Sequence, residues 1–122
     1  MAIGERMERG EIWTTTGKDC AGKPRPAVIV QDSRFDATDS VTVCPLTTHE
    51  TEAPIFRLRI DPNERNGLRA QSQLMVDKIT TVSKAKIGRL IGRLDNEDLL
   101  SLDRAMVVFL GLAGSKKNTD TD

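Results

Sequence analysis

Apolar and polar residues alternate in short runs over most of the chain, and clusters of glycine, proline, aspartate and threonine separate these runs. Alternation with a period of two is typical of strands that bury one face, and short β-branched runs are typical of fully buried strands. The pattern predicts strands at residues 9–15, 27–31, 41–46, 55–60, 72–82 and 87–94, the fifth with a polar interruption at 77–78.

The last apolar stretch repeats at helical spacing. Asp95 is a good N-cap for it, Glu97 and Asp98 suit the positive end of the helix dipole, and Gly111 is a natural stop. Short strands closed by one C-terminal helix predict a small α+β protein with a strongly bent sheet or partial barrel. The apolar stripe of the helix consists of Leu99, Leu102, Met106 and Phe109, widened by Val107 and Leu110.

Three residues carry separate packing predictions. Pro45 has no backbone N–H, so we expect it at a strand edge or in a bulge. Phe35 lies in the polar connection after residue 31, and we expect it to pin that connection to the core. Trp13 is expected to be a core or dimer-interface anchor rather than a base-stacking residue, since aromatic residues make up only 3% of the chain.

The length of 122 residues and an ordinary globular composition predict one domain that buries its own core. We assign this domain to residues 8–112, with a flexible leader at 1–7 and a disordered tail at 113–122. No apolar run approaches the roughly 18 residues that span a bilayer, and residues 1–6 do not resemble a secretory signal. Cys20 and Cys44 form no metal-ligand spacing and suit a reducing cytoplasm, so with His49 as the single histidine we expect no metal.

Charge is uneven along a chain whose formal net charge is zero. Residues 55–93 hold nine basic and three acidic residues, a balance of +6. A basic segment of this kind can form a phosphate-binding surface, and it can equally be a solvated face.

One arginine stands out because its neighbours restrict it. Pro24 and Pro26 flank Arg25, fix φ on both sides of it and favour extended geometry at the entrance to the second predicted strand. A guanidinium positioned in this way suits a phosphate or carboxylate that it must meet in a defined pose. The alternative is an ordinary basic residue in a rigid turn.

The order of five short motifs along residues 8–112 resembles the MazF/PemK toxin family. The resemblance implies a sequence-specific, metal-independent endoribonuclease of a toxin–antitoxin pair, folded as a small SH3-like barrel with a C-terminal helix and acting as a homodimer. The motifs, in order, are Arg9-Gly-Glu-Ile-Trp, Gly22-Lys-Pro-Arg-Pro-Ala-Val-Ile-Val-Gln, Val43-Cys-Pro-Leu-Thr-Thr, Ser72-Gln-Leu-Met-Val-Asp-Lys-Ile and Ile87-Gly-Arg-Leu.

The resemblance also implies site residues. The family's catalytic arginine falls on Arg25, its catalytic threonine on Thr47, and a further aspartate on Asp77. In one branch an arginine two residues before that aspartate takes part in catalysis. This chain has Met75 there, so the pairing does not carry over intact, and a structural partnership of Asp77 with Lys78 or Arg69 is the alternative.

We expect RNA phosphates to be contacted by basic residues and the bases to be read by polar loop groups. The expected contacts are Lys18, Lys23, Gln31, Thr48, His49, Arg57 and Lys78. The 2′-hydroxyl of RNA would be the nucleophile, giving a 2′,3′-cyclic phosphate or 3′-phosphate and a 5′-hydroxyl. Asp77, Glu11, His49 and a phosphate oxygen all stay open as acceptors of the 2′-proton.

The expected partners follow from the same resemblance. They are single-stranded RNA, with mRNA as the expected target, a second copy of the chain, and a MazE-like antitoxin with an acidic tail. We expect no cofactor, no membrane contact and a cytoplasmic location. The alternatives are a non-catalytic toxin of the same fold, such as a CcdB-like gyrase poison, and a degenerate member that only binds RNA. The chain lacks the Trp-Gly-Ile-like tail expected of the first, and its intact Arg25 and Thr47 count against the second.

Overall fold

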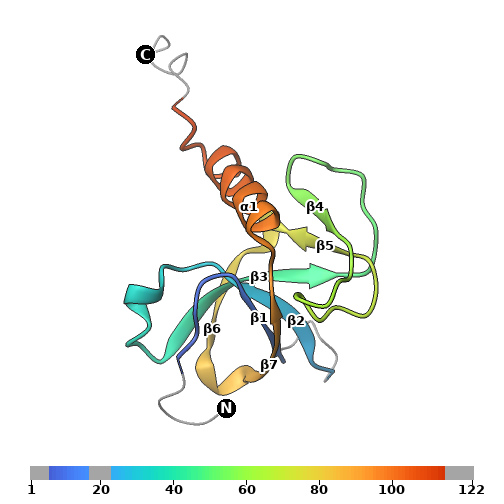
Figure 1. Ribbon diagram of the computed structural model, residues 1–122. Helices are drawn as coiled ribbons and strands as arrows, with labels where there is room; N and C mark the ends of the chain where they lie inside the picture. Colours follow the sequence, from blue (N-terminus) through green and yellow to red (C-terminus); the bar gives the residue numbers. More distant parts are fainter. Residues whose placement is uncertain (1–5, 17–22, 115–122) are drawn as a thin grey trace.

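The computed structural model describes residues 6–16 and 23–114 of the chain. In this part, seven strands and one α-helix follow one another, with 3₁₀ turns between some of the strands (Figure 1). The elements are β1 (Glu11–Thr15), β2 (Arg25–Ile29), η2 (Ser33–Phe35), β3 (Ser40–Thr47), β4 (Arg57–Ile60), β5 (Ser72–Met75), η3 (Val76–Lys78), β6 (Thr80–Ser83), η4 (Lys84–Lys86), β7 (Ile87–Arg93) and α1 (Asn96–Phe109).

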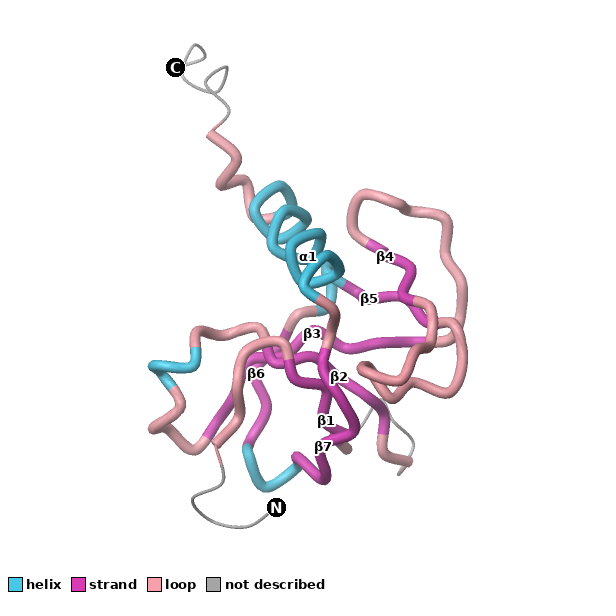
Figure 2. Tube along the Cα trace, viewed as in Figure 1, coloured by secondary structure: helices cyan, strands magenta, loops and turns pink. Residues whose placement is uncertain are grey.

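All strand pairs of the described residues are antiparallel, in the order β4-β5-β3-β2-β1-β7, and β6 also pairs with β3. The predicted α+β class and bent antiparallel sheet are therefore confirmed, but the sheet does not close into a barrel, because its two end strands, β4 and β7, do not pair. Long loops join β3 to β4 and β4 to β5 on one side of the molecule (Figure 2).

The sheet buries residues on both faces. Ile12 and Val28 belong to a cluster that α1 covers through Leu102 and Ala105. Trp13 follows Ile12 in β1, and Ala27 precedes Val28 in β2. Both belong to a second cluster on the opposite face of the sheet. Strict alternation in β1 and β2 therefore supplies both clusters, and Trp13, which is 3% exposed, is a core residue as expected.

The C-terminal helix begins and ends where the sequence predicts. Asp95 is at the N-cap position, but its side chain accepts a hydrogen bond from Asn63 Nδ2 (3.0 Å) instead of capping the helix. At the other end, Gly111 has a φ of +75°, and Gly111 and Leu112 donate backbone hydrogen bonds to Val108 and Val107. This is the Schellman arrangement. No helix in the described part of the chain has the length and apolarity needed to cross a membrane.

Pro45 was expected at a strand edge or in a bulge, and this prediction is wrong. It lies inside the central strand β3, opposite Ala27 of β2. On its other side β3 changes partner, because Val43 pairs with β6 and Leu46 pairs with β5. Proline is tolerated here because Pro45 lies between the residues of β3 that pair with β6 and those that pair with β5. Neither pairing needs a hydrogen bond from the Pro45 nitrogen.

Two further predictions near the N-terminal half are corrected. Phe35 does not pin its connection to the core, because it is 62% exposed and stacks under the Arg34 guanidinium. Lys84 and Asp36 tether that connection instead, with Nζ 2.8 Å from Oδ1. The flexible leader does not extend to residue 7, since Met7 is fully buried in the second cluster. Residues 1–5 lie outside the described residues.

Candidate functional site

The register of the sheet brings Arg25 and Thr47 to one end of neighbouring strands. β2 and β3 pair through Ile29–Val43, Val28–Cys44 and Ala27–Pro45. Extending the same register by two residues places Arg25, the first residue of β2, opposite Thr47, the last residue of β3. By this extension of the register, the two residues singled out by the sequence come to the same end of the sheet, although they are 22 positions apart along the chain.

These two residues belong to a row of polar side chains that crosses five strands, which we call the polar row. Thr15 pairs with Arg25, Thr47 pairs with Gln73, and Gln73 pairs with Arg59. Directly paired residues of adjacent strands point to the same face. The polar row therefore follows the rim of the face whose interior holds Trp13 and Ala27.

Arg25 is presented to solvent with its backbone fixed. The side chain is exposed and makes no hydrogen bond or ion pair with any described residue. The surrounding backbone is held by pairing with Thr15 and by the prolines on either side. A cation that is rigidly placed and not neutralised by any carboxylate of the described ranges is available for an external anion.

Thr47 ends its strand in a side-chain turn. Its Oγ1 accepts a hydrogen bond from the His49 backbone N–H at 3.1 Å. The turn directs the chain out of the sheet, and both Thr48 and His49 are exposed. Because the Thr47 oxygen is used as an acceptor, its hydroxyl proton is free to donate to a group that binds at the polar row.

An open groove of about 870 Å³ lies behind this end of the sheet. One wall contains Pro24, Pro26 and Thr48, and the other is formed by residues 67–70 and 88–91. Arg69 and Arg89 line it, and neither guanidinium forms an ion pair within the described residues. Together with Arg25, which lies between the groove-lining Pro24 and Pro26, these two arginines give three cations without partners among the described residues, which favours a polyanionic ligand.

Asp77 is held by Arg57, not by Lys78 or Arg69 as the sequence suggested. Arg57 Nε and Nη2 donate to the two carboxylate oxygens of Asp77 at 2.7 and 3.1 Å. Arg57 of β4 pairs with Met75 of β5, the position where one branch of the family has an arginine. The guanidinium that contacts Asp77 therefore comes from β4 instead of β5. The Arg57 hydrogen bonds hold the pKa of Asp77 below its ordinary value, and Asp77 raises the pKa of Arg57.

We expect Asp77→Asn to destabilise the fold by about 2 kcal/mol at pH 7, because it removes hydrogen bonds between charged groups. The Asp77 and Arg57 side chains are only 24% and 11% exposed. A carboxyl whose pKa is lowered by folding stabilises the protein above its unfolded pKa of about 3.9, and this contribution is lost as the pH falls through the folded pKa. The difference between wild type and variant should therefore shrink below about pH 4, which urea unfolding at pH 7, 5 and 3 measures.

Asp61→Asn is the matched control for this experiment. Asp61 forms an ion pair with Arg59 in which both side chains are more than 60% exposed, so the expected cost is below about 1 kcal/mol. A difference between wild type and Asp77→Asn that stayed constant from pH 7 to 3 would show that the carboxylate charge is not what stabilises this pair.

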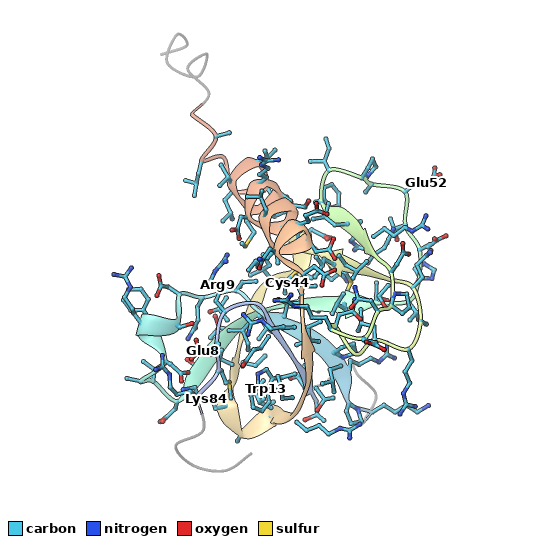
Figure 3. The ribbon with its side chains drawn as sticks, viewed as in Figure 1. Glu8, Arg9, Trp13, Cys44, Glu52 and Lys84 are labelled. Atoms are coloured by element: carbon cyan, nitrogen blue, oxygen red, sulfur yellow. The ribbon has the colours of Figure 1, made fainter. Side chains whose placement is uncertain are left out.

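Cys44 is excluded as a nucleophile. Burial raises the pKa of its thiol to about 12, and the residue lies in the cluster beneath α1 (Figure 3). A protonated thiol in the core does not attack a substrate at neutral pH. Within the described ranges, no group of three His, Cys, Asp or Glu side chains is arranged to hold a metal ion.

The remaining predicted RNA contacts are spread widely. Lys23 and Lys78 are exposed, near Arg25 and Asp77 respectively. Gln31 is six residues beyond Arg25 and two past the end of β2, about 20 Å from Arg25 for an extended chain. There its amide joins β2 to Thr42 and Phe35 instead of reaching the polar row. Lys18 lies outside the described residues.

Two of the groups considered for proton transfer are also placed. Glu11 Oε1 accepts hydrogen bonds from Trp13 Nε1 (3.0 Å) and from the Glu8 backbone (2.9 Å), at the end of β1 away from Thr15. His49 is on the turn that Thr47 begins. The sequence reasoning missed Gln73 and Arg59, although alternation with the inward-facing Leu74 and Leu58 marks both as outward-facing.

The described residues form an open antiparallel sheet with one C-terminal helix, and among them Arg25 has no side-chain partner on the polar row. A family model for the "PemK-like, MazF-like toxin of type II toxin-antitoxin system" matches residues 8–110. The chain belongs to this family.

Known proteins support this membership. The chain is 50% identical over 109 residues to a probable endoribonuclease MazF from Mycolicibacterium smegmatis, covering 88% of this chain and all of that protein. The solved Mycobacterium tuberculosis toxin MazF-mt6 superposes with a TM-score of 0.69 at 25% identity, over 83% of this chain and 97% of that one. A mycobacterial endoribonuclease solved in complex with its cognate antitoxin superposes at 0.71 and 23% identity, over 86% and 95%.

Proposed function

We infer that this chain is an endoribonuclease and the toxin of a type II toxin–antitoxin pair. Membership of the family and the relative with 50% identity, a probable endoribonuclease, support this function. At the level of the site, the observation that supports it is the β2–β3 register, whose extension by two residues brings Arg25 opposite Thr47 on the polar row. We further propose that the substrate is single-stranded RNA and that the 2′-hydroxyl of RNA is the nucleophile.

Arg25 and Thr47 fit complementary parts of this reaction. Attack of the 2′-oxygen on phosphorus forms a bond to the phosphate, builds negative charge on its non-bridging oxygens, and releases the 5′-oxygen of the next nucleotide. The planar guanidinium of Arg25 matches two of these oxygens and stays protonated, so it stabilises the developing charge. The Thr47 hydroxyl donates a hydrogen bond to the same phosphate.

Asp77 is proposed here to hold Arg57 rather than to accept the 2′-proton. Both of its oxygens already accept hydrogen bonds from Arg57, and its pKa is lowered. A carboxylate of low pKa is a weak base, because efficient proton acceptors titrate near the working pH. Lys23, Thr48, His49 and Lys78 remain proposed RNA contacts, and Lys18 and Gln31 stay predictions.

We propose two protein partners. One is an antitoxin whose acidic tail covers Arg25 on the polar row and the groove arginines Arg69 and Arg89, a role that the antitoxin complex of the mycobacterial relative supports. The other is a second copy of this chain. The C-terminal end of α1 exposes an apolar patch, and contiguous exposed patches mark association surfaces. The patch consists of Val107, Val108, Phe109, Leu110 and Leu112. A toxin that acts on mRNA works in the cytoplasm, which is the location we propose.

The test is to incubate the purified protein with a long single-stranded RNA in EDTA and map the 5′ ends. Cuts at discrete sites that leave 5′-hydroxyl groups are expected. Thr47→Val should slow cleavage about a hundredfold, because it removes one hydrogen-bond donor from the transition state. Thr47→Ser keeps the hydroxyl and should retain most of the activity.

Thr38→Val is the control, because Thr38 is an exposed threonine in the connection before β3. It should cleave like the wild type. Absence of cleavage of several diverse RNAs by the wild type would contradict the proposed activity and favour a non-catalytic toxin of the same fold. Gyrase inhibition would then be the next assay.

A further inference from the structure

The side chain of Gln73, on β5, forms two hydrogen bonds with the backbone of Thr51, which lies between β3 and β4. Its Oε1 accepts a hydrogen bond from the Thr51 N–H at 3.0 Å, and its Nε2 donates to the Thr51 carbonyl at 3.0 Å. The carboxamide thus satisfies both backbone groups of one residue, as a neighbouring strand would. Glutamine is suited to this because it carries a donor and an acceptor on one planar group.

Thr51 also accepts a hydrogen bond from a side chain on β4. Arg57 Nη1 donates to Thr51 Oγ1 at 3.3 Å, while the rest of its guanidinium is bound to Asp77. Gln73 and Arg57 lie on the paired strands β5 and β4, with Gln73 two residues before Met75, the partner of Arg57. Thr51 is therefore bound at its backbone and at its side chain by two rigid strands.

Thr51 belongs to the β3–β4 loop, residues 48–56, which starts directly after Thr47. The loop runs along the outside of the molecule, where Glu52 lies at its outer edge (Figure 3). Residues 48–50 are all exposed. They are held between two fixed points, the turn at Thr47 and the anchored Thr51. Without the second point, the turn at Thr47 would be the one hydrogen-bonded link between these three residues and the described part of the sheet.

We propose that Gln73 is a positioning residue that determines the RNA sequence preference of this toxin. It acts through Thr51 by fixing residues 48–50 beside Arg25, so that Thr48 and His49 meet the bases next to the cleaved phosphate in one arrangement. This inference rests on the proposed endoribonuclease activity. Gln73 does not touch the reacting atoms, so its removal changes which sites are cut more than how fast the best site is cut.

The test compares Gln73→Ala with wild type on a library of short single-stranded RNAs. The expected result for the variant is a ratio of cleavage at preferred to non-preferred sequences that falls about tenfold, the effect of losing roughly two ordinary hydrogen bonds. The rate at saturating preferred RNA should change by less than about threefold, with the loss appearing in KM. A purely structural role would lower cleavage of all sequences equally.

Gln71→Ala is the matched control. Gln71 lies two residues away, is exposed, and donates to the Asp61 carboxylate instead of the loop. Its sequence preference should equal that of the wild type. Gln73→Glu is the second variant, because it keeps the shape and the acceptor for the Thr51 N–H but loses the donor. Its preference should fall between those of wild type and Gln73→Ala.

Hydrogen exchange of the loop gives a readout that does not depend on activity. Faster exchange at the Thr51 amide is expected in Gln73→Ala and not in Gln71→Ala. Unchanged exchange would overturn the anchoring itself. Faster exchange with an unaltered cleavage preference would overturn the role in specificity. A wild type that cuts no RNA would instead contradict the proposed function, while the exchange result would still decide whether Gln73 anchors the loop.

Discussion

Replacing Arg25 with alanine is expected to slow RNA cleavage about a thousandfold or more, the loss typical of removing a guanidinium that stabilises a phosphoryl transition state. Its side chain makes no bond with any described residue, so the free energy of unfolding should change by less than about 0.5 kcal/mol. Single-turnover cleavage of a short RNA that contains the preferred sequence measures the first quantity, and urea unfolding measures the second.

Two companion variants separate charge from geometry. Arg25→Lys keeps the positive charge but cannot span two phosphate oxygens, so its rate should fall between those of wild type and Arg25→Ala. Arg34→Ala removes another exposed arginine, in the η2 turn beyond the far end of β2, and should cleave like the wild type. An Arg25→Ala protein that kept more than a tenth of the wild-type rate would contradict a catalytic role for Arg25.

Gly67→Ala is expected to destabilise the fold by about 3 kcal/mol or more, because it combines backbone strain with a clash. Gly67 has a φ of +68°, and a Cβ there would lie 2.0 Å from the Ile91 carbonyl oxygen. The contact is backbone against backbone. It brings the β4–β5 connection onto β7, where the Arg93 N–H donates to the Arg65 carbonyl at 2.9 Å.

Gly111→Ala is the control for the strain alone, since Gly111 has a similar φ of +75° with nothing within 4 Å of the added Cβ. Its cost should be about 1 kcal/mol. Urea unfolding of both variants gives the comparison. If Gly67→Ala were no less stable than Gly111→Ala, the close approach of β7 would not contribute to stability, and the groove wall that it builds would be loose.

The strands and the helix were predictable because their signals are local. Alternation in residues 11–15 and 40–47, and helical spacing after Asp95, act within a few positions of the chain. The errors concern long-range contacts. Pro45 is tolerated in a central strand because β3 exchanges one partner for another beside it. Asp95 is drawn from its capping role by Asn63, which is 32 residues away.

The candidate site also combines residues that local signals identify with contacts that depend on the long-range register of the sheet. The sequence singled out Arg25 by its flanking prolines and Thr47 by resemblance, but their adjacency required the β2–β3 register. Nearness along the chain suggested Lys78 or Arg69 as the partner of Asp77, whereas the β4–β5 register supplies Arg57. The link from Gln73 to Thr51 joins a strand to a loop 22 residues away. No periodicity encodes such a contact.

We propose that the chain cleaves RNA through the RNA's own 2′-hydroxyl at a phosphate held by Arg25 and Thr47. The most direct test is a short RNA in which the nucleotide on the 5′ side of the cleaved bond carries a single 2′-deoxy substitution, incubated with the protein in EDTA. Cleavage at that bond is expected to be lost, while the unmodified RNA is cut. Cleavage of the substituted RNA at a comparable rate would contradict this proposal, because a different nucleophile would then attack the phosphate.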